Sequence, residues 1–412
     1  MKRKLKSLAF FKKKQEEVSL EASENEYFES ISKRFAITQV VLYLCLFAFI
    51  LVFFFRNINL ITYQNFYHFF QDLGATASAS EVFSEEAVIY PTSSEQSFTL
   101  YREGLAIAGN QSLTLFSSSG RQSFSVNLDN YRNPIAEGKG KYLLVYELGG
   151  TRYSLYNFYT KLHEGTTERP ITGATVADNG MYAIISSTEQ YASVVSLYND
   201  RFDLVGRYNY VESDGYVMDA DVTEDGSSIA ILTSASAGDG FRTVLRIYKP
   251  GEKSAVKETL LGTSLGLDCS FSNKSALIVL CTNGIFFTTA KGEIVATQSF
   301  QKASPVASVM DERGVAVVLE GADASQKDRL LVFDPDGKLQ YQASVSDRIH
   351  QISRYGNSIF LLSTGQIRRI SVKGGNDTVW EGMTDGRRML ALRENEILLC
   401  SPQKAVYIPI GS

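Results

Sequence analysis

The sequence predicts an all-β protein, a β-propeller of eight four-stranded blades, preceded by one transmembrane helix. Three observations predict it: an uncharged stretch of 21 residues, eight short apolar runs that recur along the rest of the chain, and hairpin turns around each run. Apolar runs of four or five residues are typical of buried strands. A recurrence of about 40–45 residues is the period of a propeller blade.

The overall composition is ordinary and excludes several classes of protein. Among 412 residues, 41 Lys and Arg stand against 45 Asp and Glu, a net charge of −4, and 44% of residues are hydrophobic. These values exclude a multi-span membrane protein, a disordered chain and a strongly basic nucleic-acid-binding protein. With 3 His and 1 Trp, many metal and cofactor chemistries lack material, so no cofactor is expected.

The charge is unevenly distributed along the chain. Residues 1–35 carry nine Lys or Arg and six Glu, a net +3, so the remainder carries −7. No Lys or Arg occurs between Arg56 and Arg102. Basic residues favour the cytoplasmic side of an anchor. We therefore expect a basic cytoplasmic tail at residues 1–35 and an extracytoplasmic location, at the cell membrane, for the bulk of the chain.

The uncharged stretch covers residues 35–55, and as a helix it would span the hydrocarbon core of a bilayer, about 30 Å thick. A buried core helix would keep a polar face, whereas only Thr38 and Gln39 are strongly polar here. A cleaved signal peptide is the stronger alternative. Its apolar region is shorter, however, and its cleavage site lies close behind, while the nearest small-residue pattern here is Ala75–Ala79. We expect an uncleaved signal anchor at residues 36–55.

Residues 57–81 predict a juxtamembrane helix followed by a linker of small residues. Thr62 can cap this helix and Gly74 can end it. The helix is amphipathic and rich in aromatic residues, which favour the membrane interface. Packing beneath the folded domain is the equal alternative.

The propeller is expected over residues 82–412. The eight runs, whose starts are 37 to 48 residues apart, are LAIA (Leu105–Ala108), YLLVY (Tyr142–Tyr146), YAII (Tyr182–Ile185), IAIL (Ile229–Leu232), LIVLC (Leu277–Cys281), VAVVL (Val315–Leu319), IFLL (Ile359–Leu362) and ILLC (Ile397–Cys400). A shorter alternating segment and a turn precede each run, and a hairpin follows it. This order predicts four antiparallel strands in each unit.

The last unit is one strand short, because only one strand's length of chain follows Ile397–Cys400. An open propeller would expose a sheet edge, which proteins avoid. The extended segment Ala87–Tyr90 is placed to supply the missing strand. This predicts eight blades, the last one shared between the two ends of the domain. A ring of seven blades is the alternative if one weak unit is not a blade.

Three segments carry a resemblance to a known family: Tyr131–Asn157, Thr172–Asn199 and Val217–Leu232. They resemble the uncharacterised, single-pass, membrane-anchored β-propeller proteins of Gram-positive bacteria, notably clostridia, a domain family of unknown function. The resemblance implies an extracytoplasmic propeller tethered by one N-terminal helix. It implies no established activity and no catalytic residues. The repeats are also similar to WD40-like blades without the Gly-His and Trp-Asp signatures.

Few motifs that carry chemistry occur. GTSLG (Gly262–Gly266) matches the nucleophile-elbow pattern, but that motif needs a following helix. Here it lies between the fourth and fifth blades, before a strand, so we interpret it as a chance match. Its possible bases, His163 and His350, are expected in outer or connecting regions.

The four cysteines are expected to be unpaired. Cys45 lies in the anchor, and Cys269, Cys281 and Cys400 lie in predicted inner strands. A disulfide between Cys269 and Cys281 is possible outside the cell. Free Cys packs well as a small buried side chain, and this is our interpretation of all four.

Asp219 and Asp221 are the only candidate site residues. They lie in DADVTEDG (Asp219–Gly226), which fails the EF-hand pattern because Thr223 and Glu224 stand at ligand and glycine positions. Both carboxylates could face the channel mouth and bind a cation or an amine. Solvated acids at a propeller face are the simpler interpretation. No catalytic, cofactor-binding or metal-ligating residue is assigned.

These features predict a non-enzymatic binding or protein-interaction scaffold at the cell surface, with a protein, peptide or cell-wall glycan as partner. The acidic outer portion argues against nucleic acid. The alternative is a propeller enzyme, a hydrolase or a quinone-dependent oxidoreductase, with a site at the channel mouth. Three or more ionisable side chains converging there would favour the enzyme. A sensor coupled through the anchor to the tail is a third hypothesis.

Overall fold

The computed structural model describes residues 31–32, 34–52 and 87–410, except 103, 118, 159, 274, 322–326, 346, 375–376 and 383–385. The predicted basic tail up to residue 30 and the juxtamembrane segment at residues 57–81 lie outside the described residues. The chain divides into two units, one that contains the N-terminal helix and one that contains the propeller.

The N-terminal helix Arg34–Val52 is long and apolar enough to cross a membrane. All its residues are exposed, which a core helix would not allow. Thr38 Oγ1 donates to the carbonyl oxygen of Arg34 at 2.9 Å, and Gln39 Nε2 donates to the Tyr43 hydroxyl at 3.2 Å. Polar groups bonded within the helix suit a lipid environment. A membrane anchor and a signal sequence both fit this helix.

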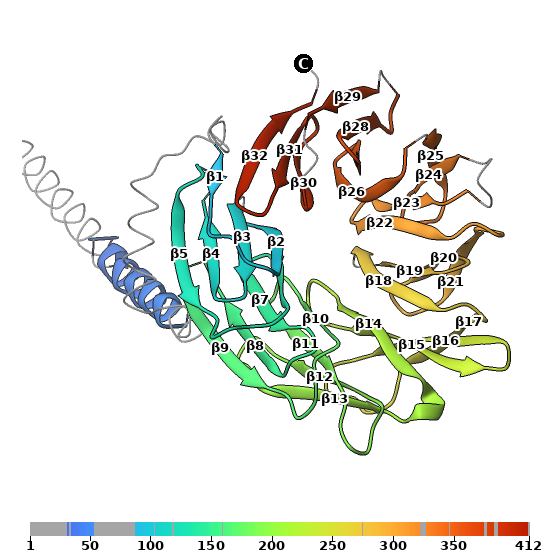
Figure 1. Ribbon diagram of the computed structural model, residues 1–412. Coiled ribbons are helices and arrows are strands. Elements are labelled where there is room, and N and C mark those ends of the chain that lie inside the picture. Colours follow the sequence, from blue (N-terminus) through green and yellow to red (C-terminus); the bar gives the residue numbers. More distant parts are fainter. Residues whose placement is uncertain are drawn as a thin grey trace, which may run out of the picture. The chain divides into compact units, whose positions relative to one another are not determined.

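The strands form eight antiparallel sheets of four strands, as predicted, and the sheets follow one another around a ring (Figure 1). The first four blades are β2 (Gln96–Tyr101), β3 (Gly104–Gly109), β4 (Ser112–Phe116) and β5 (Gln122–Asn127); β6 (Pro134–Lys139), β7 (Tyr142–Glu147), β8 (Arg152–Tyr156) and β9 (Lys161–Thr166); β10 (Gly173–Val176), β11 (Tyr182–Ser186), β12 (Ser193–Tyr198) and β13 (Leu204–Tyr210); and β14 (Tyr216–Val222), β15 (Ile229–Ala237), β16 (Gly240–Tyr248) and β17 (Lys257–Gly262).

The other four blades complete the ring. They are β18 (Gly266–Asn273), β19 (Ala276–Cys281), β20 (Gly284–Thr289) and β21 (Ile294–Ser299); β22 (Pro305–Asp311), β23 (Gly314–Leu319), β24 (Asp328–Phe333) and β25 (Leu339–Val345); β26 (Ile349–Tyr355), β27 (Ser358–Ser363), β28 (Gln366–Ser371) and β29 (Thr378–Glu381); and β30 (Arg388–Arg393), β31 (Glu396–Cys400), β32 (Lys404–Pro409) and β1 (Val88–Ile89). We number the blades 1 to 8 along the ring, so that blade 1 begins with β2 and blade 8 begins with β30.

The ring closes through β1, as predicted. Val88 pairs with Ala405 and Ile89 with Lys404, so β1 is the outermost strand of blade 8. Tyr90 follows β1, and its hydroxyl donates to the carbonyl oxygen of Ser401 at 2.5 Å. The eight-bladed prediction is confirmed, and the seven-bladed alternative is wrong.

Each apolar run predicted from the sequence lies in the second strand of a blade, and each run is buried on both sides. In β15, Ile229 and Ile231 pack against blade 3, whereas Ala230 and Leu232 pack against blade 5. Alternate residues of a strand point to opposite faces of a sheet. A strand covered on both faces is therefore apolar at every position, which explains why these runs do not alternate.

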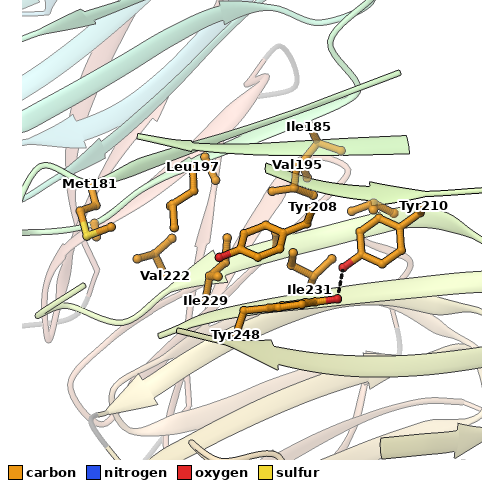
Figure 2. Packing of buried hydrophobic residues seen from close by; sticks show 14 residues of the cluster. Met181, Ile185, Val195, Leu197, Tyr208, Tyr210, Val222, Ile229, Ile231 and Tyr248 are labelled. Carbon is orange, nitrogen blue, oxygen red and sulfur yellow. Dashed lines mark hydrogen bonds between the residues drawn. The ribbon is translucent and has the colours of Figure 1, made fainter. Parts of the chain in front are cut away.

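The core consists of hydrophobic clusters between neighbouring blades. Figure 2 shows the cluster between blades 3 and 4, where side chains of β12 and β13 face those of β14, β15 and β16. Tyr208 and Tyr248 lie with ring centroids 4.2 Å apart, and the Tyr210 hydroxyl bonds to that of Tyr248 at 3.1 Å (Figure 2). Comparable clusters join the other blades, including blades 8 and 1 across the closure.

Candidate functional site

The innermost strands of blades 2 to 6 line one cavity of about 270 Å³. Four carboxyl groups line it: Glu137 from β6, Asp219 and Asp221 from β14, and Asp268 from β18. Lys139 of β6 lines the same cavity. We call this space the acidic cavity. From the sequence, a channel position for Asp219 and Asp221 was only an alternative to solvated acids, and the structure places both at this cavity together with Glu137 and Asp268.

Asp219 and Asp221 join blade 4 to blade 5. The backbone N–H of Cys269 donates to Asp219 Oδ2 at 2.8 Å, and that of Phe271 donates to Asp221 Oδ2 at 2.8 Å. The other oxygen of Asp221 accepts the N–H of Val222 at 2.9 Å. Both side chains therefore satisfy buried backbone donors, and neither is simply a solvated surface acid. Ligand binding by the same carboxylates stays a prediction.

Other innermost strands use the same kind of contact between blades. Ser97 Oγ accepts the backbone N–H of Ala136 at 3.1 Å, from β2 to β6. Ser353 Oγ accepts the N–H of Ala391 at 3.0 Å, from β26 to β30. Uncharged side chains thus perform this structural task elsewhere in the ring. The acids of blade 4 bring an additional property, ionisable carboxyl groups, to the channel.

Burial raises the pKa values of three carboxyl groups that line the acidic cavity. The pKa of Glu137 rises from 4.5 to about 7, because burial and then the nearby Asp221 disfavour its charged form. A hydrogen bond from Thr175 Oγ1 at 3.1 Å opposes this shift. Burial and then the nearby Asp268 raise the pKa of Asp219, and burial raises the pKa of Asp268. A cation bound in the cavity would lower these pKa values again.

The segment Gly262–Gly266, which matches the nucleophile-elbow pattern in sequence, does not form a strand–turn–helix elbow. Gly262 ends β17 and Gly266 begins β18, so Ser264 lies between two strands with no helix after it. His163 lies in the outermost strand β9, as expected. His350 does not lie in an outer or connecting region, which corrects the prediction, because it belongs to the innermost strand β26. These side chains come from different blades.

The cysteines are free, as predicted. Cys269 lies opposite Val279, and Cys281 lies opposite Gly266, so the two cysteines of blade 5 do not face each other. Burial raises the pKa of the Cys281 thiol to about 11. Cys269 is buried as well, and its pKa is also raised. Protonated, buried thiols act as small hydrophobic side chains.

Four consecutive blades carry a β-bulge at the same place. The pairing with the second strand skips one residue near the start of each innermost strand. The skipped residues are Met218 in β14, Leu267 in β18, Val306 in β22 and His350 in β26. A bulge leaves one residue unpaired and re-aims its side chain, and bulges are frequent beside functional sites. The innermost strands of blades 1 to 3 pair without such a shift.

Three of the bulges place exposed apolar residues near the start of an innermost strand. All innermost strands begin on the same face of the ring, because each blade has four antiparallel strands; we call this the upper face. Met218 and Leu267 are 37% exposed and Val306 is 43% exposed. Their strands are neighbours around the ring (Figure 1). We call these three residues the apolar arc. The sequence analysis missed them, since a bulge interrupts the alternation that reveals strands.

The four carboxyl groups meet the condition that the enzymatic alternative requires, a convergence of ionisable side chains in the channel. In the described part of the chain, however, no three His, Cys, Asp or Glu side chains are arranged to hold a metal ion. Two of the four carboxylates already bond the backbone of the next blade. The convergence therefore has a structural explanation in part.

Comparison with known proteins agrees with this architecture. A family model described as a family of unknown function (DUF5711) matches residues 80–409. The chain belongs to this family. The matched segment of the DUF5711 protein contains the whole propeller, which confirms the resemblance to a propeller family of unknown function. No curated protein sequence matches the chain.

Solved structures share the fold of the DUF5711 propeller at low sequence identity. Sqt1 of Saccharomyces cerevisiae has a TM-score of 0.59 and 8% identity, over 80% of this chain and all of that one. Chaetomium thermophilum Sqt1, bound to the N-terminus of ribosomal protein L10, has a TM-score of 0.54 and 12% identity, over 79% of this chain and 100% of that one. The C-terminal WD40 domain of Sif2 has a TM-score of 0.56 and 13% identity, over 80% of this chain and 99% of that one. These similarities show the fold alone.

Proposed function

We propose that this DUF5711 protein is a membrane-anchored, non-enzymatic interaction scaffold. Its propeller would bind a protein partner through the upper face, over blades 4 to 6. The observation that carries the proposal is the apolar arc, three exposed apolar side chains placed by bulges in three neighbouring strands. Exposed apolar patches beside polar surroundings mark interaction sites. Sqt1, a propeller of similar fold, was solved with a protein terminus bound.

A protein segment fits the apolar arc better than the other partners considered from the sequence. Met, Leu and Val side chains favour apolar side chains of a partner, whereas a glycan would require polar groups and aromatic faces. An anionic membrane or a nucleic acid would be repelled by the carboxylates of the acidic cavity. We therefore favour a protein or peptide over a cell-wall glycan.

The tether completes the proposal. Residues 36–55 would be the membrane anchor, residues 1–35 a cytoplasmic tail, residues 57–81 a juxtamembrane segment, and residues 82–412 the extracytoplasmic propeller. The excess of basic residues before the helix supports this orientation. The resemblance seen in the sequence supports a place on the surface of a Gram-positive bacterium. Such a tether would keep the propeller at the membrane, where surface proteins are its candidate partners.

Site-directed photo-crosslinking in living cells tests the proposal. A photoreactive amino acid replaces Leu267 in the arc or, as the control, Leu260 in the outermost strand β17, which is 61% exposed. We expect one discrete protein adduct from position 267 and none from position 260. No adduct at position 267, or the same adducts at both positions, would contradict the proposal.

The enzymatic alternative has one observation in its favour, the Glu137 carboxyl with a pKa raised to about 7. A general acid or base works best with a pKa near the operating pH. The Glu137→Gln variant separates the two functions. It would abolish turnover by a hydrolase that uses this carboxyl, and it would leave a partner bound at the apolar arc.

A further inference from the structure

We infer that the partner segment is cationic as well as apolar: a Lys or Arg flanked by apolar residues, with the charged group in the acidic cavity and the apolar residues on the apolar arc. The inference rests on the proposed function and names the chemistry of its partner.

The apolar arc and the acidic cavity are continuous along the chain. Met218 directly precedes Asp219 in β14, and Leu267 directly precedes Asp268 in β18. In both strands an exposed, unpaired apolar residue is thus followed by a carboxyl that lines the cavity. The arc residue and the carboxyl are therefore neighbours in each strand, about 3.3 Å apart along its axis.

The charge of this region is unbalanced. Among the described residues, four carboxyl groups and one basic side chain, that of Lys139, line the acidic cavity. On the upper face, the turn before β14 carries Glu212 and Asp214, and the hairpin between β15 and β16 carries Asp239. Arg242 is close to these acids, but its Nη2 donates to the carbonyl oxygen of Ser213 at 2.8 Å. A positive group entering from the upper face would relieve the repulsion among the carboxylates.

A long basic side chain suits this arrangement. Lys and Arg pack their aliphatic stems against apolar surface while their charged ends reach a polar site. The arc would hold the stem and the neighbouring apolar residues, and the cavity would hold the ammonium or guanidinium group. A purely apolar segment would leave the cavity empty, and an acidic segment would be repelled by it.

A peptide selection tests the inference. Full-length protein in lipid nanodiscs is presented with phage that display random peptides of about nine residues, a length that spans an interaction patch. The selected peptides are then synthesised, and their affinities are measured for the wild type and three variants. The double variant Leu267→Ser/Val306→Ser removes the arc, and Asp268→Asn removes one cavity charge. Leu260→Ser/Leu339→Ser is the matched control, in outer strands where both residues are exposed.

We expect the selected peptides to be enriched in Lys or Arg beside apolar residues. Their affinity should fall about tenfold in the arc variant and severalfold in Asp268→Asn, and it should stay unchanged in the control. A cooperative melting transition in each variant would show that it is folded. Selected peptides without enrichment in Lys or Arg, or affinities insensitive to the arc variant, would overturn the inference.

The crosslinking experiment separates this inference from the proposed function. A partner segment crosslinked at position 267 that contains no Lys or Arg would contradict the inference alone, and the scaffold function would stand. The absence of any adduct would contradict both.

Discussion

At the residue scale, two opposing requirements act on the carboxyl groups of the acidic cavity. Asp219 must accept the backbone N–H of Cys269 in the next blade, which favours its charged form. Burial favours the protonated forms of Glu137, Asp219 and Asp268 by raising their pKa values. Because both act in one cavity, charge here should affect both stability and binding.

The stability of the propeller should therefore decrease as the pH rises from about 5 to about 8. The unfolded Glu137 loses its proton near pH 4.5 and the folded one near 7. Between these values the folded state holds more protons, so the free energy of unfolding falls with increasing pH, by about 3 kcal/mol from this residue. The raised pKa values of Asp219 and Asp268 act in the same direction.

Melting temperatures measured across this pH range provide the test, with Glu137→Gln as the informative variant. The melting temperature of the variant should fall less between pH 5 and pH 8 than that of the wild type, because a neutral amide replaces the titrating group. Glu293→Gln, at an exposed position of blade 5, should melt like the wild type at every pH. A wild type whose melting temperature is constant or rises from pH 5 to 8 contradicts the assigned electrostatics.

Asp221→Ala should lower the free energy of unfolding by about 3 kcal/mol, because it leaves the buried N–H groups of Phe271 and Val222 without their acceptor. Denaturant unfolding measures this change. Asp239→Ala, in the exposed hairpin between β15 and β16, is the matched control and should cost less than about 0.5 kcal/mol. Equal costs for the two variants would show that Asp221 does not join the blades.

At the element scale, the second strands and the closing strand β1 were predictable, and the bulges were not. The second strands are buried on both faces, so their apolar runs stand out in the sequence. Ala87–Tyr90 was found because the last unit lacked a strand. The bulges shift the pairing by one residue in β14, β18, β22 and β26. Their exposed apolar residues are not distinguishable in sequence from core residues.

Tyr90 should carry much of the stability of the closure. It is buried, its ring centroid lies 5.8 Å from that of Phe98, and its hydroxyl donates to Ser401. Tyr90→Ala should cost about 4 kcal/mol through the lost packing, and Tyr90→Phe about 1 kcal/mol through the lost hydrogen bond. Ile89→Ala, at a position 77% exposed, should be nearly neutral in the same unfolding experiment. A Tyr90→Ala variant as stable as Ile89→Ala would mean that β1 does not secure the ring.

At the scale of the whole molecule, the chain combines an apolar helix with a closed propeller. Blade number and closure were predictable because each blade repeats one local pattern along the chain. The acidic cavity was predictable only in part. Asp219 and Asp221 lie in a conspicuous acidic segment, whereas Glu137 and Asp268 are 131 residues apart in sequence and meet only because the ring brings their strands together.

The central claim is that an extracytoplasmic propeller binds a protein partner at its upper face, and one labelling measurement tests both parts. Intact cells carrying Leu267→Cys or Leu260→Cys are treated with a maleimide that does not cross membranes, before and after a wash in high salt. The native cysteines of the propeller are buried and should not react.

We predict that position 260 labels fully in intact cells and that position 267 labels only after the wash. High salt screens the charges that bind the partner, so that the partner dissociates. That result would place the propeller outside the membrane with its apolar arc occupied. Failure of position 260 to label in intact cells would contradict the orientation, and equal labelling of both positions before the wash would contradict the bound partner.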